Sequence, residues 1–520
     1  MRTPLPTAIP LPAPTATHGS PCANGVVVRE PEENPGLVED CETLLDVRGI
    51  LSDRGLGWRT TISIRNWDGV GIGRTSNRVE TLDLTITGLN SRIPPELVRL
   101  SSLRELRLDG DDWSGGIPPE LGQFEGLQGI HIFGKGLRGE IPPELGQLTS
   151  LRELWLWAEN LEGEIPEELA QLRNLETLSL AESGLKGEIP PSLGQLANLQ
   201  RLLLIDNELT GGIPAQIGAL FNLRILDLTK NQLTGPIPPE LGRLESLEEL
   251  RLSNNRLTGE IPRELSDLAD LRKLEIADNQ LTGGIPRAIG QMGSLESLML
   301  GGNLLEGEIP IELANLTGLA HLSLSSNRLT GNIPPELALL PELVSLGLND
   351  NLLTGVILPA LGNSERLQWL RLSNNRLSGG IPPELGDATR MENLVLSNNP
   401  LSGEIPAELG QLSELRRLEL TATGLEGGIP AELGRLLNLE HVNLSDNYLD
   451  GPLPPELGVL RNLEVLSARN NLLTGEVPAE LGNLDRLQQL DIAGNNFDGC
   501  IPRRLRHVRT DSDLLYCPDR

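Results

Sequence analysis

The side chains that most often perform catalysis are few and scattered in this sequence. The five histidines are His18, His131, His321, His441 and His507, and each stands alone. No G-x-S-x-G, H-E-x-x-H or phosphate-binding loop is present in the sequence. Pairs of acidic residues are numerous, but 72 Asp and Glu residues among 520 supply many by chance. We therefore predict a protein that is not an enzyme and that uses no metal or other cofactor.

Four cysteines form one pair near each end of the chain. Cys22 and Cys41 lie near the start, and Cys500 and Cys517 lie near the end. The tight C-x2-C spacing that is typical of metal sites is absent. We predict that Cys22 bonds to Cys41 and that Cys500 bonds to Cys517, which implies an oxidising compartment. Four unpaired thiols in a cytosolic protein are the alternative.

Large side chains between residues 131 and 225 form a candidate recognition surface. The sequence Trp155-Leu156-Trp157 puts two of the six tryptophans on one side of a predicted strand. Large apolar side chains on the solvated side of a sheet usually mark an interaction surface. The predicted ligand-binding residues are His131, Phe133, Trp155, Trp157, Leu203, Ile205 and Ile225. Packing of these residues against the N-terminal part of the chain is the alternative.

A repeat of 24 residues positions these side chains. Eighteen copies of the pattern L-x-x-L-x-L-x-x-N-x-L-x-G-x-I-P follow one another without insertion, beginning at Val79. The segment L-x-x-L-x-L alternates, so we expect a strand with one buried face. Numbered from the first residue of each copy, positions 3, 5, 7 and 8 should face outward. The glycine permits a turn, Ile-Pro fixes an extended backbone, and a short helical turn closes each copy.

Asparagine at position 9 is expected to bond the backbone of its own copy and of the next copy. It is present without a break from Asn207 to Asn399. The first five copies replace it with Thr87, Asp111, Lys135, Glu159 and Ser183. The first five copies are therefore the irregular part of the repeat, and they include Trp155 and Trp157.

This pattern resembles the plant-type leucine-rich repeat, whose distinguishing segment is L-x-G-x-I-P. The resemblance covers residues 79–510 and implies an α/β solenoid. In that family the chain is a right-handed superhelix with a concave parallel β-sheet and with short helical turns on the convex side. Residues 40–45, followed by Trp67-Asp68-Gly69-Val70, are similar to the N-terminal cap of plant leucine-rich repeat receptors. Ile72 stands where that cap has a cysteine, so a bacterial surface protein is an alternative source.

Composition and resemblance together predict four parts of the chain. Residues 1–21 form a disordered Pro/Thr-rich linker, residues 22–78 an N-terminal cap, residues 79–510 the solenoid and residues 511–520 a C-terminal cap. Asn34-Pro35 predicts the start of a helix in the N-terminal cap, and the alternation over residues 60–64 predicts a strand. Leu514 and Tyr516 predict a closing edge strand.

Charge and resemblance limit the range of partners. The net charge of −29 argues against nucleic acid and against anionic membranes, and the sequence has no apolar run that could span a membrane. The resemblance implies the ectodomain of a receptor, without a kinase or a transmembrane segment. We expect a secreted or cell-surface module that binds a protein or peptide on its concave face, with a signal or anchor upstream of Met1. Acidic Glu153 and Glu159 favour a partner with a basic or amide group. The alternatives are a carbohydrate-binding protein, such as an inhibitor of wall-degrading enzymes, and a structural spacer.

Overall fold

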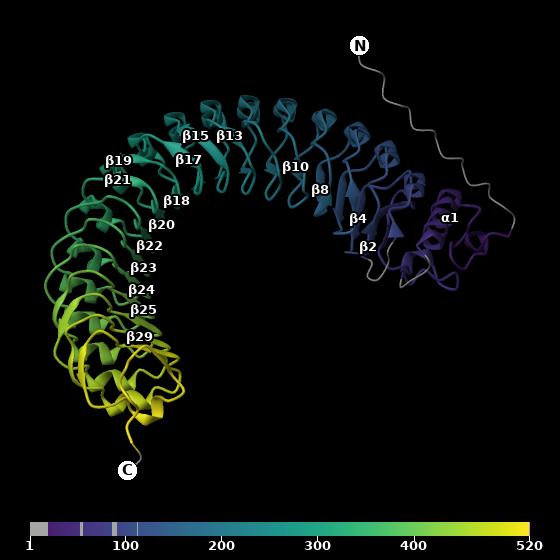
Figure 1. The fold of residues 1–520 in the computed structure, drawn as a ribbon. Coiled ribbons are helices and arrows are strands. Elements are labelled where there is room, and N and C mark those ends of the chain that lie inside the picture. Colours follow the sequence, from purple (N-terminus) through teal and green to yellow (C-terminus); the bar gives the residue numbers. More distant parts are fainter. Residues whose placement is uncertain (1–18, 52–55, 86–90, 112, 519–520) are drawn as a thin grey trace. The chain divides into compact units, whose positions relative to one another are not determined.

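The computed structural model describes residues 19–51, 56–85, 91–111 and 113–518 (Figure 1). The predicted linker therefore lies outside the described residues up to residue 18. Contacts between residues divide the chain into two compact units, residues 1–257 and 258–520, and each is described by itself. Within the described ranges, no helix is both long enough and apolar enough to cross a membrane.

Parallel strands of the L-x-x-L-x-L segments build the main sheet of each unit. Ile130 pairs with Leu154, and Leu154 pairs with Leu178, so consecutive strands are offset by one copy. Each of these three side chains is fully buried. The predicted α/β solenoid is therefore confirmed, with a core made of stacked aliphatic side chains. Figure 1 shows the strands on one side of each copy and the helical turns on the other.

In the first unit the main-sheet strands are β1 (Val70–Ile72), β2 (Val79–Thr85), β4 (Glu105–Asp109), β6 (Gly129–Phe133), β8 (Glu153–Trp157), β10 (Thr177–Ser179), β11 (Arg201–Leu203), β12 (Ile225–Asp227) and β14 (Glu249–Arg251). In the second unit they are β16 (Lys273–Glu275), β18 (Ser297–Met299), β20 (His321–Ser323), β22 (Ser345–Gly347), β23 (Trp369–Arg371), β24 (Asn393–Val395), β25 (Arg417–Glu419), β27 (His441–Asn443), β29 (Val465–Ser467), β31 (Gln489–Asp491) and β33 (Arg509–Thr510). Strand β1 is antiparallel to β2, and the strands that follow in each unit are parallel.

Short strands on the L-x-G-x-I-P side are β3 (Ser91–Arg92), β5 (Trp113–Ser114), β7 (Arg138–Gly139), β9 (Asn160–Leu161), β13 (Thr234–Gly235), β15 (Arg256–Glu260), β17 (Gln280–Thr282), β19 (Glu306–Glu308), β21 (Arg328–Thr330), β26 (Glu426–Gly428), β28 (Tyr448–Asp450), β30 (Thr474–Glu476) and β32 (Asn496–Asp498). They pair locally between neighbouring copies, for example β7 with β9.

The predicted helical turns are 3-10 helices, most of which follow an Ile-Pro segment, and two further 3-10 helices lie before the first copy. In the first unit the 3-10 helices are η1 (Pro21–Ala23), η2 (Ile64–Asn66), η3 (Pro95–Arg99), η4 (Pro119–Gln123), η5 (Pro143–Gln147), η6 (Glu167–Gln171), η7 (Pro191–Gln195), η8 (Ala215–Ala219) and η9 (Pro239–Arg243). In the second unit they are η10 (Arg263–Asp267), η11 (Arg287–Gln291), η12 (Ile311–Asn315), η13 (Pro335–Leu339), η14 (Pro359–Asn363), η15 (Pro383–Asp387), η16 (Ala407–Gln411), η17 (Ala431–Arg435), η18 (Pro455–Val459), η19 (Ala479–Asn483) and η20 (Arg503–Leu505).

The position-9 asparagines bond the backbone of two copies as predicted, but the second copy is the preceding one and not the next one. The Asn303 side chain is only 5% exposed, and its Oδ1 accepts a hydrogen bond from the Leu281 amide at 3.1 Å. Its Nδ2 donates to the carbonyls of Ile276 at 3.0 Å and Leu300 at 3.1 Å. One side chain therefore satisfies backbone groups of two consecutive copies.

Strands β4, β6 and β8 are five residues long, whereas β10, β11 and β12 have three residues each. From copy five onward, position 8 often adopts a left-handed backbone, as in Glu182 (φ 50°) and Asp206 (φ 56°). Gly134 and Ala158, at position 8 of copies three and four, do not have a positive φ. The strands of copies three and four consequently extend through position 7 before the chain turns.

Helix α1 (Pro35–Ile50) lies in the N-terminal cap and begins at the predicted residue. Asp40 on this helix is fully buried. Its carboxylate forms an ion pair with Arg78 at 2.6 Å and accepts a hydrogen bond from the Val79 amide at 2.8 Å. The cap is thus joined to the first repeat strand by a buried carboxylate. In the structure Cys22 is bonded to Cys41, the pairing expected from the sequence.

The predicted strand over residues 60–64 is wrong. Residues 60–62 form a turn, with the Ile62 amide donating to the Arg59 carbonyl, and η2 begins at Ile64. Ile64 is buried, but Ile62 is 36% exposed, so the two isoleucines do not share a buried strand face. The nearby rings of Trp58 and Trp67 stack at 5.7 Å, and their packing takes the place of strand pairing.

The closing strand also differs from the prediction, because β33 (Arg509–Thr510) pairs with β31 and ends six residues before Tyr516. Tyr516 instead forms a bridge with Ile501, beside the bond between Cys500 and Cys517. The Asp511 carboxylate accepts the amides of Ile492 and Ala493 at 2.8 and 3.0 Å. A side chain therefore covers amides that another repeat strand would otherwise pair.

Replacing Asn303 with alanine should lower the free energy of unfolding by about 1–3 kcal/mol, because buried backbone groups lose their partner. Asn315 of the same copy is exposed at the end of η12, so Asn315→Ala is the matched control. Its effect should stay within about 0.5 kcal/mol. Denaturant melts compare the two variants, and equal losses would contradict the assigned role of position 9.

Peptide mapping without reducing agent should recover Cys22 linked to Cys41 and Cys500 linked to Cys517. The linked residues are 19 and 17 positions apart, so each bond should raise the free energy of unfolding by about 3 kcal/mol. When a bond is reduced, unfolding should begin in the terminal copies, since these have a neighbour on one side only. Four free thiols, or a bond between the two ends, would disprove the assignment.

Candidate functional site

Strands β6 and β8 place four aromatic residues in an aromatic block on the outward face of the main sheet. His131 pairs with Trp155 at position 5, and Phe133 pairs with Trp157 at position 7. The rings of His131 and Trp155 are stacked, with centroids 6.2 Å apart and 12° between their planes. The rings of Phe133 and Trp157 are 6.5 Å apart and tilted. All four side chains are partly exposed, so the sequence placed them on one surface correctly.

Carboxylates hold both indole rings by their edges. The Trp155 Nε1 donates to Glu153 Oε2, and the Trp157 Nε1 donates to Glu182 Oε2, each at 3.2 Å. The polar edge of each indole is therefore satisfied within the chain, and each ring stays partly exposed. Glu182 was missed in the sequence, because the left-handed turn at this residue brings it back towards copy four.

The charges beside the position-7 row are paired within the chain. Lys135 Nζ lies 3.1 Å from Glu159 and 5.7 Å from the Trp157 ring centroid. The hydrogen bond to Glu159 raises the pKa of Lys135. Arg107 lies 5.8 Å from the Phe133 ring centroid and 3.4 Å from Asp109. Glu159, which the sequence suggested as a group that favours a basic partner, is thus already neutralised by Lys135.

The charges beside the position-5 row are not balanced in this way. The carboxylates of Glu105 and Glu153 lie 4.0 and 3.6 Å from His131 Nε2. Burial, followed by the negative charge of Glu153, raises the pKa of Glu105. Burial lowers the pKa of His131, with Glu153 acting in the opposite direction and Arg107 in the same one. The His131 imidazole, whose neutral form burial favours, therefore lies beside two carboxylates from position 3.

The remaining predicted binding residues extend the surface only partly. Leu203 and Trp155 both pair with Ser179, which lies between them and is 5% exposed. Ile205 follows the end of β11 at position 7 and is half-buried. Ile225 pairs with Arg201 at position 3, so it lies in a different column from Leu203. The structure thus places Leu203 two strands from Trp155 and places Ile225 between charged neighbours, Arg201 and Glu249.

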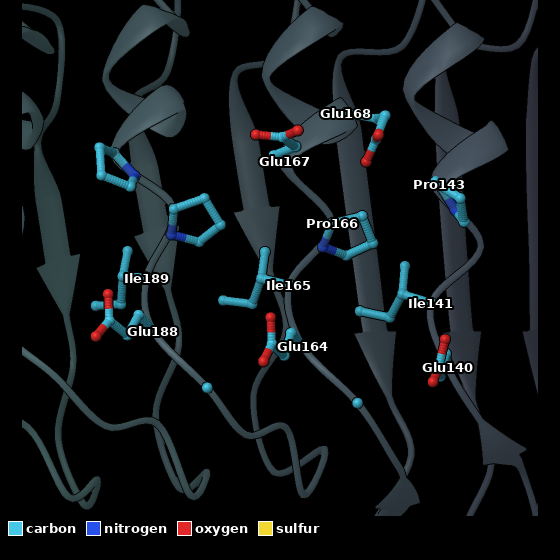
Figure 2. Close-up of a pocket in the computed structure, with 14 residues that line it drawn as sticks. Glu140, Ile141, Pro143, Glu164, Ile165, Pro166, Glu167, Glu168, Glu188 and Ile189 are labelled. Atoms are coloured by element: carbon cyan, nitrogen blue, oxygen red, sulfur yellow. The ribbon is translucent and has the colours of Figure 1, made fainter. Parts of the chain in front are cut away.

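A groove lies on the L-x-G-x-I-P side of copies three to five (Figure 2). It has a volume of about 910 Å³. Glu140, Glu164 and Glu188 line it at equivalent positions, beside Ile141, Ile165 and Ile189. Glycine makes this arrangement possible, because a Cβ on Gly187 would lie 2.6 Å from Glu164 Cγ.

The groove follows from the repeat. A similar groove of about 580 Å³ in the second unit is lined by Glu404, Pro406 and Pro430 and by their neighbours. Stacked Ile-Pro segments therefore line a groove in each of the two units. No cluster of His, Cys, Asp or Glu able to hold a metal ion occurs among the residues that the structure describes.

Comparison with protein families and solved structures places the repeat in a known class. Two family models match the chain, and both are described as leucine-rich repeat. The first matches residues 221–281 and 271–329. The second matches residues 174–196, 366–388, 390–412, 438–460, 462–484 and 486–508. The chain is 31% identical to the TDR receptor over 85% of this chain and 82% of that one, with a TM-score of 0.73. The chain belongs to the leucine-rich repeat family.

Other solved members of the leucine-rich repeat family are also similar. The ectodomain of the Arabidopsis receptor kinase HAESA, in complex with an extended IDA peptide hormone, is 30% identical over 92% of this chain and 99% of that one, with a TM-score of 0.65. A leucine-rich repeat protein of Leptospira interrogans is 29% identical over 84% and 96%, with a TM-score of 0.53. Comparison with curated protein sequences gives no match.

The titration of His131 tests the charges around the leucine-rich repeat site. Its pKa should lie below the ordinary value of histidine, and Glu153→Gln should lower it further, because the Glu153 charge raises it. Arg107→Gln should raise it. A lowered pKa means that the folded state binds the proton less tightly than the unfolded state, so stability should fall as pH drops below the ordinary histidine value. NMR titration of the His131 ring measures its pKa in the wild type and in both variants, and denaturant melts at several pH values measure the stability. A rise in the His131 pKa in Glu153→Gln would contradict the geometry.

Proposed function

We propose that this leucine-rich repeat protein is a non-enzymatic recognition module that binds a protein or peptide over the aromatic block. The observation that carries this proposal is four partly exposed aromatic side chains fixed on one sheet face by strand register and edge hydrogen bonds. Aromatic side chains in fixed orientations supply large contact areas with little loss of conformational entropy.

The contacts of the block favour a binding role over packing against the N-terminal cap. The partners of the four rings, Glu105, Arg107, Glu153, Glu182 and Lys135, come from copies two to five. Trp58 and Trp67 of the cap stack on each other instead. The predicted site residues therefore keep solvent-facing surface for a partner.

The family relatives favour a peptide as the partner and an extracellular setting. The HAESA ectodomain was solved in complex with a peptide hormone, and the receptor RGFR1, 28% identical, in complex with RGF2. Two disulfide bonds are consistent with an oxidising compartment. We place the protein outside the cytosol, as a secreted or surface-displayed module.

The double variant Trp155→Ala with Trp157→Ala tests the proposal. Each truncation of a central aromatic anchor commonly costs about 2 kcal/mol or more, so binding should weaken at least about thirtyfold. The full chain and the variant are presented to a displayed random peptide library and to a surface-protein extract, and the affinity of selected peptides is then measured. The melting curve should barely change, because neither tryptophan belongs to the buried core.

Trp369 provides the matched control. It is a partly exposed tryptophan in β23 of the second unit, so Trp369→Ala removes the same chemistry elsewhere. This variant should bind as the wild type does. Unchanged binding by the double variant, or its unfolding, would assign the aromatic block a structural role. Selection of glycans in place of peptides on a glycan array would favour the carbohydrate-binding alternative.

A further inference from the structure

We infer that the surface formed by the carboxylates of Glu105 and Glu153, on the two sides of Gly129, is a subsite for a positively charged group of the partner, an ammonium or a guanidinium. This inference rests on the proposed function and names the chemistry that one part of the aromatic block selects. It assigns specificity to Glu105, Gly129 and Glu153, of which the sequence had suggested Glu153 only.

Strand register forms the subsite. Glu105 pairs with Gly129 across β4 and β6, and Gly129 pairs with Glu153 across β6 and β8. The glycine has no side chain, and a Cβ placed there would lie 1.9 Å from Glu105 Oε2. The Glu105 carboxylate therefore occupies the space above Gly129, in the column that leads to Glu153. Glu105 and Glu153 therefore stand on the two sides of Gly129, which has no side chain to separate their carboxylates.

No cation of the described chain compensates these carboxylates. In the part of the chain that the structure describes, the only basic group within ion-pair distance of these carboxylates is the imidazole of His131. Arg107 stands beside His131 in the register, but its guanidinium lies at Asp109 and over Phe133. Burial lowers the pKa of His131, which favours the neutral imidazole. The subsite thus carries negative charge that a partner can neutralise.

The stacked rings of His131 and Trp155 supply the wall of the subsite. A cation is attracted to an aromatic face, and a nearby carboxylate strengthens its retention. The neighbouring row already shows this arrangement, because Lys135 lies over Trp157 and pairs with Glu159. Among the described residues, no cation lies over the ring of Trp155. A lysine or arginine side chain of the partner would complete the same arrangement in the position-5 row.

Small probes test the subsite directly. Nα-acetyl-lysine methylamide and its uncharged analogue Nα-acetyl-norleucine methylamide are titrated into the full chain, with the Trp155 indole N–H and the His131 ring followed by NMR. The lysine derivative should bind at least about fivefold more tightly, as expected for a partly exposed charge interaction. Equal affinities, or no response at either residue, would overturn the inference.

Three variants assign the preference to residues. Glu105→Gln with Glu153→Gln should abolish the preference for lysine over norleucine. Gly129→Ala should reduce it, because the Cβ displaces the Glu105 carboxylate while the strand backbone accepts alanine. Glu159→Gln is the control, since that carboxylate is paired with Lys135, and it should keep the preference. Loss of preference in the control alone would overturn the assignment.

The peptide library separates this inference from the proposed function. Peptides selected by the wild type should be enriched in Lys and Arg, and the Glu105→Gln, Glu153→Gln variant should select peptides without that enrichment. Selection that depends on Trp155 and Trp157 but shows no basic preference would leave the proposed function intact and overturn the subsite. Absence of any selected peptide would instead count against both.

Discussion

Parallel pairing between strands one copy apart is the constraint on which the rest of this structure depends. Because consecutive strands are offset by 24 residues, every position of a copy stacks on the same position of its neighbours. Inward positions then form a continuous aliphatic core, and outward positions form columns with a spacing of about 4.8 Å. Residues as distant in the sequence as Glu105 and Glu153 become parts of one surface for this reason.

The turn after each strand decides how much of that surface is regular. Where asparagine occupies position 9, its amide bonds two copies, and position 8 commonly takes a left-handed backbone. Lys135 and Glu159 occupy position 9 in copies three and four, where they are exposed and paired with each other. The strands there extend to Phe133 and Trp157, and position 8 of these two copies lacks the left-handed backbone found at Glu182 and in many later copies.

Charge then distinguishes the two aromatic rows from each other. The position-7 row carries its own cations, Arg107 and Lys135, each beside a carboxylate. Beside the position-5 row, the position-3 carboxylates of Glu105 and Glu153 have only the imidazole of His131 as an ion-pair partner among the described residues. A surface whose stacking is fixed by the backbone thus acquires chemical asymmetry from side chains that differ between neighbouring copies.

The sequence by itself determined the repeat, the buried positions and the column in which each outward side chain stands, because period and alternation are properties of the chain alone. Tertiary structure decided what the period does not encode. The turn around Ile62 depends on cap packing, and the last strand at Arg509 depends on how Asp511 and the Cys500–Cys517 bond close the final copy. The pairing of Glu159 with Lys135 and the position of the Glu105 carboxylate above Gly129 depend on side-chain directions, which neighbouring strands fix only after they have paired.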